Sequence, residues 1–189
     1  MVPVVVGSVL ALLPETRAAD NWNVDGANGV LHVRGALTES ACRLEMASAY
    51  QEVWLGETGT ARLAQVGGQG TPVAVQLRLQ DCLRSPANNR DERSGTLLWS
   101  AQQPAVSLSF VAPADADNPQ LIAVRGASGV ALRMTDARGR DIRLGHRGAP
   151  LMLAVGQETL DYIVTPERTR APLQAGAYTA HVDFRLNYD

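Results

Sequence analysis

Apolar and polar residues alternate along the C-terminal end of the chain. From Tyr178 to Asp189 every second residue is apolar, and this period of two predicts a β-strand with one buried face. The side chains expected to point into a core are Tyr178, Ala180, Val182, Phe184, Leu186 and Tyr188. A strand this regular has to pair with another, because an unpaired edge exposes backbone donors and acceptors. The alternation alone fits the closing strand of an ordinary β-sandwich.

Short alternating or apolar runs continue through the rest of the chain, separated by segments rich in Gly, Pro, Asn and Asp that predict turns. The predicted strands are Val30–Ala36, Cys42–Met46, Glu52–Gly56, Val73–Cys82, Thr96–Trp99, Val106–Val111, Leu121–Val124, Val130–Thr135, Leu151–Leu153, Thr159–Val164 and Tyr178–Tyr188. Strands this short and this closely spaced predict an all-β fold, a β-sandwich of the immunoglobulin type.

The N-terminal segment predicts an export signal. An apolar run from Val2 to Leu13 is followed by small residues at Thr16 and Ala18, which suit cleavage after Ala18. The run is too short for a membrane span, and the basic residues that usually open such a signal are missing. The alternative is a buried first strand of a cytosolic protein. We favour a signal peptide over residues 1–18 and a mature chain that begins at Ala19.

Charge and composition argue against several classes of function. The chain has 17 basic and 19 acidic residues and a net charge of -2, so no basic field predicts a nucleic-acid partner. It contains no lysine, which removes Schiff-base and P-loop chemistry. Asp115 and Asp117 lie in a proline-bounded turn and are expected to be turn residues. His32, His146 and His181 are scattered, without the spacing of metal ligands. We therefore expect no enzyme activity, no catalytic residues, no cofactor and no metal.

Several motifs together resemble the pilins of the chaperone–usher pathway of Gram-negative bacteria. Gly176 stands fourteen residues from the end, the alternating strand that follows has a penultimate Tyr188, and an earlier alternating strand ends in Asp81-Cys82. The segment Gly129–Gly145 is similar to the family's hairpin, in which a strand ends in Asp, turns at Gly and returns to Leu-Gly. The resemblance implies an incomplete immunoglobulin-like β-sandwich that lacks its final strand and exposes a hydrophobic groove.

The two cysteines, Cys42 and Cys82, sharpen the expected compartment. An even pair in an exported β protein is most simply one disulfide, formed in an oxidising periplasm. The strand that leads to Cys82 also resembles the strand that leads to the second cysteine of pilins. We therefore expect a single Cys42–Cys82 disulfide.

The resemblance also implies where partners bind. A periplasmic chaperone would pair with the C-terminal strand, and in the fibre the N-terminal extension of the next subunit would replace it. The acceptor residues would be Gly176, Tyr178, Ala180, Val182, Phe184, Leu186 and Tyr188. In the donor extension, Ala27, Gly29, Leu31 and Val33 share one face. Gly29 fits the position where donor strands carry a glycine, and Leu31 and Val33 would fill the groove. The alternative is that 27–33 is the first edge strand of its own domain.

The sequence thus predicts a signal peptide at 1–18, a donor-strand extension at 19–35 and a pilin domain at 36–189. The implied function is a structural subunit of a cell-surface fimbrium that is exported through the periplasm, polymerises by donor-strand exchange and contributes to cell adhesion. The implied partners are a periplasmic fimbrial chaperone, an outer-membrane usher and neighbouring pilin subunits. The charged segment Leu83–Arg93 favours a minor subunit. The alternative is a lectin-like tip adhesin or receptor-binding module, against which the length of the chain argues.

Overall fold

The computed structural model describes residues 31–32 and 40–188 of the 189-residue chain. The expected signal peptide and the donor positions Ala27, Gly29 and Val33 lie outside the described residues. Leu31 is described, lies in no strand and is 87% exposed. The chain divides into two compact units, Met1–Leu37 and Thr38–Asp189, and every element named below belongs to the second.

Strands dominate the second unit. The strands are β1 (Arg43–Leu44), β2 (Val73–Cys82), β3 (Ala87–Arg90), β4 (Leu97–Ser100), β5 (Ala105–Val111), β6 (Ile122–Ala123), β7 (Val130–Asp136), β8 (Leu151–Met152), β9 (Gly156–Arg168) and β10 (Asp183–Asn187). A one-turn helix, α1 (Met46–Ala49), and a 3-10 turn, η2 (Thr60–Leu63), separate β1 from β2. Among the described residues no helix is long and apolar enough to span a bilayer.

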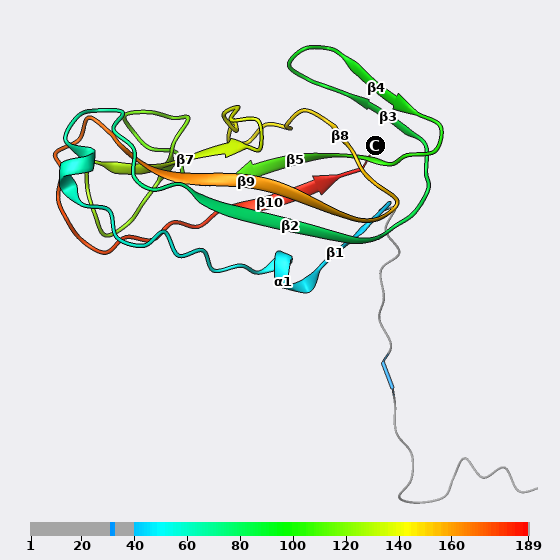
Figure 1. Ribbon diagram of the computed structural model, residues 1–189, viewed down its shortest axis with the longest axis horizontal. Coiled ribbons are helices and arrows are strands. Elements are labelled where there is room, and N and C mark those ends of the chain that lie inside the picture. Colours follow the sequence, from blue (N-terminus) through cyan, green and yellow to red (C-terminus); the bar gives the residue numbers. More distant parts are fainter. Residues whose placement is uncertain (1–30, 33–39, 189) are drawn as a thin grey trace, which may run out of the picture. The chain divides into compact units, whose positions relative to one another are not determined.

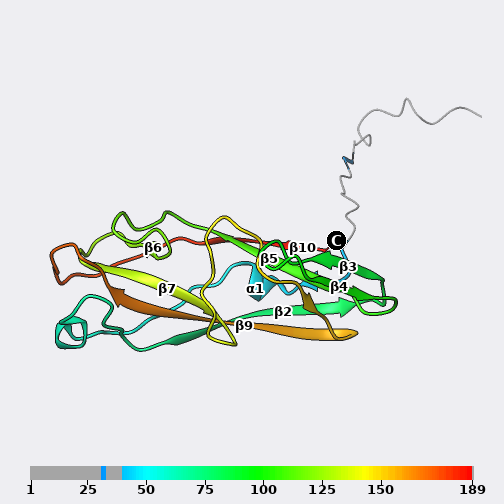
Figure 2. The same cartoon turned by 90° about the horizontal axis from the view of Figure 1, so that it is seen from above.

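The long strands form two antiparallel sheets that share one core (Figure 1). One sheet has the order β1-β2-β9-β7-β6 and the other has the order β10-β5-β8, while β3 and β4 form a separate hairpin. Figure 2 shows β5 and β10 in one layer and β2 and β9 in the other. Alternate residues of the facing strands, such as Leu77 and Leu79 of β2 and Val106 of β5, are buried between the layers. This arrangement confirms the predicted all-β, immunoglobulin-like sandwich.

A bulge near the end of β2 turns the second cysteine into the core. The ladder between β2 and β9 is regular from Val73 to Leu79 and then shifts register before Cys82. Asp81 has a φ of 54°, a left-handed conformation that Asp tolerates better than most residues. The extra residue changes the phase of the strand, so that Cys82 is buried although strict alternation from Leu79 would bury Asp81.

Several predicted strands differ from the observed elements, and the predicted strand Val30–Ala36 lies almost wholly outside the described residues. Of Cys42–Met46 only Arg43–Leu44 is a strand and Met46 begins α1, whereas β9 extends beyond both ends of the predicted Thr159–Val164. Glu52–Gly56 forms no strand. The chain beside it is held to β2 by a side chain, because the Nε2 of Gln51 donates to the carbonyl of Gln76 at 2.8 Å. The C-terminal strand is also shorter than its alternation predicts, since β10 covers only Asp183–Asn187. Ahead of β10, Thr179 makes an isolated bridge with Arg125.

Candidate functional site

The edge of β10 is the first feature of the candidate site. On one side β10 pairs with β5, in a register that sets Phe184 opposite Phe110 and Leu186 opposite Leu108. No strand within residues 40–188 pairs with its other side. The backbone groups on that side are therefore available to another strand, which is the usual property of an uncovered sheet edge.

Side chains on β10 are only half-buried although their partners on β5 are fully buried. Phe110 and Leu108 are each 3% exposed, whereas Phe184 and Leu186 remain partly accessible. Directly paired residues lie on the same face of a sheet, so the difference arises from the missing neighbour on the far side of β10. The half-buried residues that pack against the core here are Tyr178, Val182, Phe184, Leu186 and Tyr188. Phe184 packs on the core through its ring, whose centroid lies 6.3 Å from that of Phe110.

The five-stranded sheet also ends in an edge strand, β1. Its pairing with β2 comprises only Arg43 with Gln80 and Leu44 with Leu79. A disulfide between Cys42 and Cys82 reinforces this short ladder, as the sequence predicted. Leu44 is half-buried and packs against the same core as the β10 side chains. Each sheet therefore contributes one of its edge strands, β1 or β10, to a region where core residues are incompletely covered.

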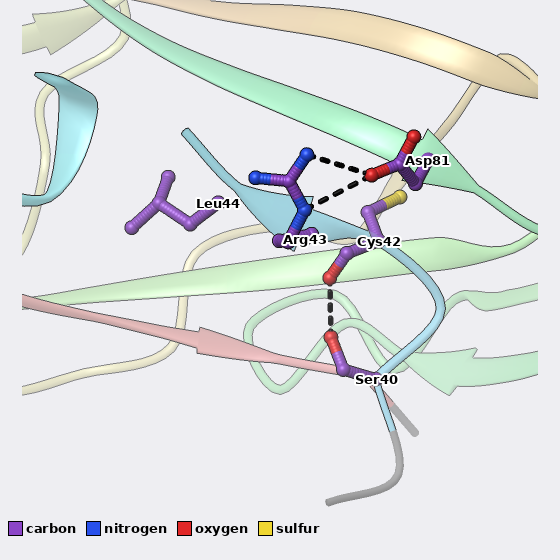
Figure 3. A pocket seen from close by; sticks show the side chains of 5 residues that line it. All are labelled: Ser40, Cys42, Arg43, Leu44 and Asp81. Atoms are coloured by element: carbon purple, nitrogen blue, oxygen red, sulfur yellow. Dashed lines mark hydrogen bonds and ion pairs between the residues drawn. The ribbon is translucent and has the colours of Figure 1, made fainter. Parts of the chain in front are cut away.

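A hollow of about 410 Å³ lies beside β1. Figure 3 shows it with Ser40 next to the end of β10. It is lined by Ser40, Cys42, Arg43, Leu44 and Asp81. Partial burial raises the pKa of Tyr188, and the nearby hydroxyl of Ser40 opposes that rise. This environment around the penultimate tyrosine is thus poorly hydrated but not closed.

A second hollow, of about 800 Å³, lies at the start of β10. Its walls come from the end of β5, from the chain around β6 and from the segment before β10: Val111, Ala112, Pro113, Ala123, Arg125, Thr179, Ala180, His181 and Asp183. Ala180, expected to be buried, is exposed because it lines this hollow. The imidazole of His181 lies 3.3 Å from the carboxylate of Asp183, so polar groups stand at the rim. We call the strip formed by Leu44 and the five half-buried residues, with a hollow at each end of β10, the β10 groove.

The predicted acceptor residues divide into two groups. Those from Val182 onward lie in the groove, as does Tyr178, whereas Gly176 is exposed and lies before it. A Cβ at Gly176 would stand 2.7 Å from the carbonyl oxygen of Gly126, so glycine permits a close approach of two backbone segments. Sequence reasoning missed Leu44, Val111 and Ala123, since nothing in their local pattern indicates which distant strand they face. The described residues contain no cluster of three or more potential metal ligands.

Arg168 holds the chain segment that leads from β9 to β10. Its guanidinium donates to the carbonyl of Gly129 at 3.1 Å and to that of Ala171 at 2.6 Å, and it also donates to the carbonyl of Thr169. A Cβ at Gly129 would stand 2.7 Å from the Cα of Leu173, so this segment packs closely on the start of β7. The guanidinium thereby fixes the connection from which β10 departs.

Arg168→Met is expected to lower the free energy of unfolding by roughly 1 to 3 kcal/mol, because it leaves partly buried carbonyls without their donor. Amide hydrogen exchange over residues 169–178 should become faster than in the wild type. Arg170→Met is the matched control, since Arg170 is exposed two positions away and should change neither quantity. Equal exchange rates in the two variants would show that the guanidinium does not hold this segment.

Comparison with known proteins adds an independent finding. The family model described as "Fimbrial protein" matches residues 31–189. The "PRS fimbrial minor pilin protein" of Escherichia coli is 31% identical over 82% of this chain and 74% of its own length. The "Fimbria A protein" of Serratia marcescens is 28% identical over 87% of this chain and 86% of its own length.

Solved structures show a similar fold. The crystal structure of the P pilus rod subunit PapA superimposes with a TM-score of 0.64 at 22% sequence identity, over 79% of this chain and all of that chain. At this level of identity the likeness supports the arrangement of strands and nothing more specific.

Proposed function

Because the chain belongs to the fimbrial protein family, we propose that it is a structural subunit of a chaperone–usher fimbria whose β10 groove accepts a strand from another protein. Members of this family are structural subunits, and the chain is not an enzyme. The single observation that carries the proposal is the contrast between Phe184 and Leu186 of β10 and their buried partners on β5. A strand added at the free edge of β10 would pair with its backbone and cover these side chains.

Two different proteins are proposed to supply that strand in turn. In the periplasm a fimbrial chaperone would cap the groove and protect an edge that is prone to aggregation. At the outer membrane an usher would receive the complex, and the extension of the next subunit would replace the chaperone's strand. The finished location would be the cell surface, within a fimbrium that contributes to adhesion. The hollows at the two ends of β10 support this proposal, because a strand that alternates large side chains needs recesses on the acceptor.

The proposed donor of this chain is its own extension, residues 19–35, acting on a neighbouring subunit. Leu31 is exposed, and the alternation through Ala27, Gly29, Leu31 and Val33 matches the period of an added strand. Gly35 and Leu37 continue this series of every second residue. Two glycines, Gly29 and Gly35, therefore share the face that would enter the acceptor groove. Either glycine would let the donor pass a shallow part of the groove.

The donor extension is tested by adding a bulky side chain to each glycine in turn. Gly29→Leu or Gly35→Leu should reduce incorporation into fibres roughly tenfold or more, because overpacking a fitted site costs about 1 to 3 kcal/mol. The complex with the chaperone should form normally, since the chaperone supplies its own strand. Mass spectrometry of purified fibres measures incorporation of each variant. We also propose that the subunit is a minor one, and the number of wild-type copies per fibre in the same measurement tests this.

Asn28→Leu is the matched control, because Asn28 lies between two donor positions of the alternating series and its side chain would point away from the groove. If the extension were instead the first strand of its own domain, the glycine variants would lose soluble complex before any assembly step. Unimpaired incorporation of Gly29→Leu would remove Gly29 from the proposed donor positions, and the same result for both variants would contradict the donor role.

A further inference from the structure

The hairpin formed by β3 and β4 presents its largest apolar side chains to solvent. Asn88 pairs with Trp99 and Arg90 pairs with Leu97, and directly paired residues share a face. Trp99 is 67% exposed and Leu97 is 49% exposed, so this is the outward face. The inward face carries Ala87 and Asn89 together with Leu98 and Ser100.

This distribution is the reverse of what folding stability favours. Asn89 is buried, and neither atom of its amide has a hydrogen-bond partner within the described residues. An unpaired buried amide is costly, whereas the Trp99 ring, which would gain most from burial, is left outside. A shift of the hairpin by one residue would exchange the two faces. Local departures from stability rules are concentrated at functional sites, which indicates that the outward face binds something.

The hairpin is also held in one conformation. The Asp91 carboxylate accepts the backbone amides of Arg93 at 2.8 Å and Ser94 at 3.3 Å, and the Arg93 amide is the main cause that lowers the pKa of Asp91. Arg90 donates through its Nη1 to the carbonyl of Gly95 at 2.8 Å. A surface that is ordered in advance loses less entropy when it binds. We call Arg90, Arg93, Leu97 and Trp99 the hairpin patch.

A second aromatic surface follows α1. Tyr50 and Trp54 are at least 80% exposed, while Leu55 packs against the core. Gln51 fixes the segment by donating to the carbonyls of Ser48 at 3.2 Å and Gln76 at 2.8 Å. We call residues 50–57 the aromatic segment.

The two surfaces are complementary in charge and lie on different sides of the domain. Residues 45–61 contain three glutamates and no basic residue, whereas residues 83–100 contain three arginines, one aspartate and one glutamate. The Asp91 carboxylate is already engaged by the amides of the turn. In Figure 1 the β3–β4 hairpin lies beyond β5 and β8, and α1 with the following chain lies on the opposite side, beyond β2. One chain therefore cannot bring its own two surfaces together.

We propose that the hairpin patch of one copy docks on the aromatic segment of a second copy, with Trp99 against Tyr50 and Trp54 and with Arg90 and Arg93 near Glu52 and Glu57. The contact uses two different surfaces, so it is heterologous and leaves one free surface on each end of a pair. It is distinct from strand exchange at the β10 groove and would act between copies whose grooves are already filled. It would pack fibre subunits side by side.

The test uses the full chain with its groove filled by a synthetic peptide of residues 19–37, which blocks strand exchange and leaves only surface contacts. Sedimentation equilibrium should show association of the wild type that increases with concentration. Trp99→Ala and Trp54→Ala should each weaken it roughly tenfold or more, the usual effect of removing a central aromatic. Val66→Ala is the control, because Val66 is exposed elsewhere and should leave association unchanged.

Mixing the two tryptophan variants distinguishes this contact from any other. Each variant keeps one intact surface, so a 1:1 mixture should regain dimers and form nothing larger. Arg93→Glu and Glu52→Arg should each weaken association, and a mixture of these two chains should likewise regain it. A wild type that does not associate, or a mixture that stays monomeric, would overturn the proposal. Native mass spectrometry measures binding of the peptide separately. A chain that binds no peptide would contradict the proposed strand-accepting role of the β10 groove. In that case association between copies is measured on the chain without peptide.

Discussion

Phe184→Asp is expected to abolish recovery of the subunit in complex with the proposed periplasmic chaperone. The ring of Phe184 lies on the floor of the β10 groove and packs on Phe110, with their centroids 6.3 Å apart. Aspartate would remove this apolar contact and place an unpaired charge where the proposed added strand would lie, which costs several kcal/mol. Tyr188→Asp, and deletion of 187–189, should have the same effect, because they remove the groove's last side chain. Co-purification of the complex from the periplasm measures the result.

Arg185→Asp is the matched control on the same strand. It introduces the same charge at the next position, but Arg185 faces away from the groove and is exposed. We expect this variant to yield the complex in amounts close to the wild type. Normal recovery of Phe184→Asp, or equal loss in the two variants, would contradict the assignment of β10 as the acceptor strand.

Loss of the disulfide is expected to have the second largest effect. Cys42 and Cys82 are separated by 40 positions, and the chain-entropy relation gives a stabilisation of about 4 kcal/mol for a loop of that length. This is a large share of the 5 to 15 kcal/mol that separates most folded domains from unfolding. Cys42→Ser with Cys82→Ser should therefore lower the urea midpoint substantially in the chaperone-free, peptide-filled protein.

The same variant should also weaken strand binding. β1 has only two residue pairs with β2, so the disulfide is the main covalent support for this side of the groove. We expect slower formation and faster loss of the peptide complex, measured by native mass spectrometry. The wild type treated with a reductant should reproduce both effects. An unchanged urea midpoint in the double variant would show that the ladder and the core hold β1 without the disulfide.

Several features followed from the sequence alone because they depend on local periodicity. Alternation identified the residues in and beside β10 that pack against the core, from Val182 to Tyr188. Two cysteines in a predicted exported β protein left one pairing, which the Cys42–Cys82 disulfide confirms. The same reasoning was wrong where local pattern competes with distant contacts. Glu52–Gly56 has strand-like residues but forms no strand, and the adjoining Gln51 contacts β2 through its side chain and not through a backbone ladder.

Other features were decided only by the tertiary structure. A period of two residues shows which side chains share a face of a strand, but it does not show which other elements that face packs against. The half-exposure of Phe184 results from the absence of a neighbouring strand beyond β10 among residues 40–188, and nothing in the pattern of 178–189 encodes that absence. Cys82 is buried only because a bulge at Asp81 shifts the phase of β2. The outward position of Trp99 depends on the pairing of β4 with β3, which places Asn89 inside. The sequence determined the strands and the cysteine pair, and the packing of strands distant in sequence determined the groove and the exposed surfaces, because burial depends on neighbours in space.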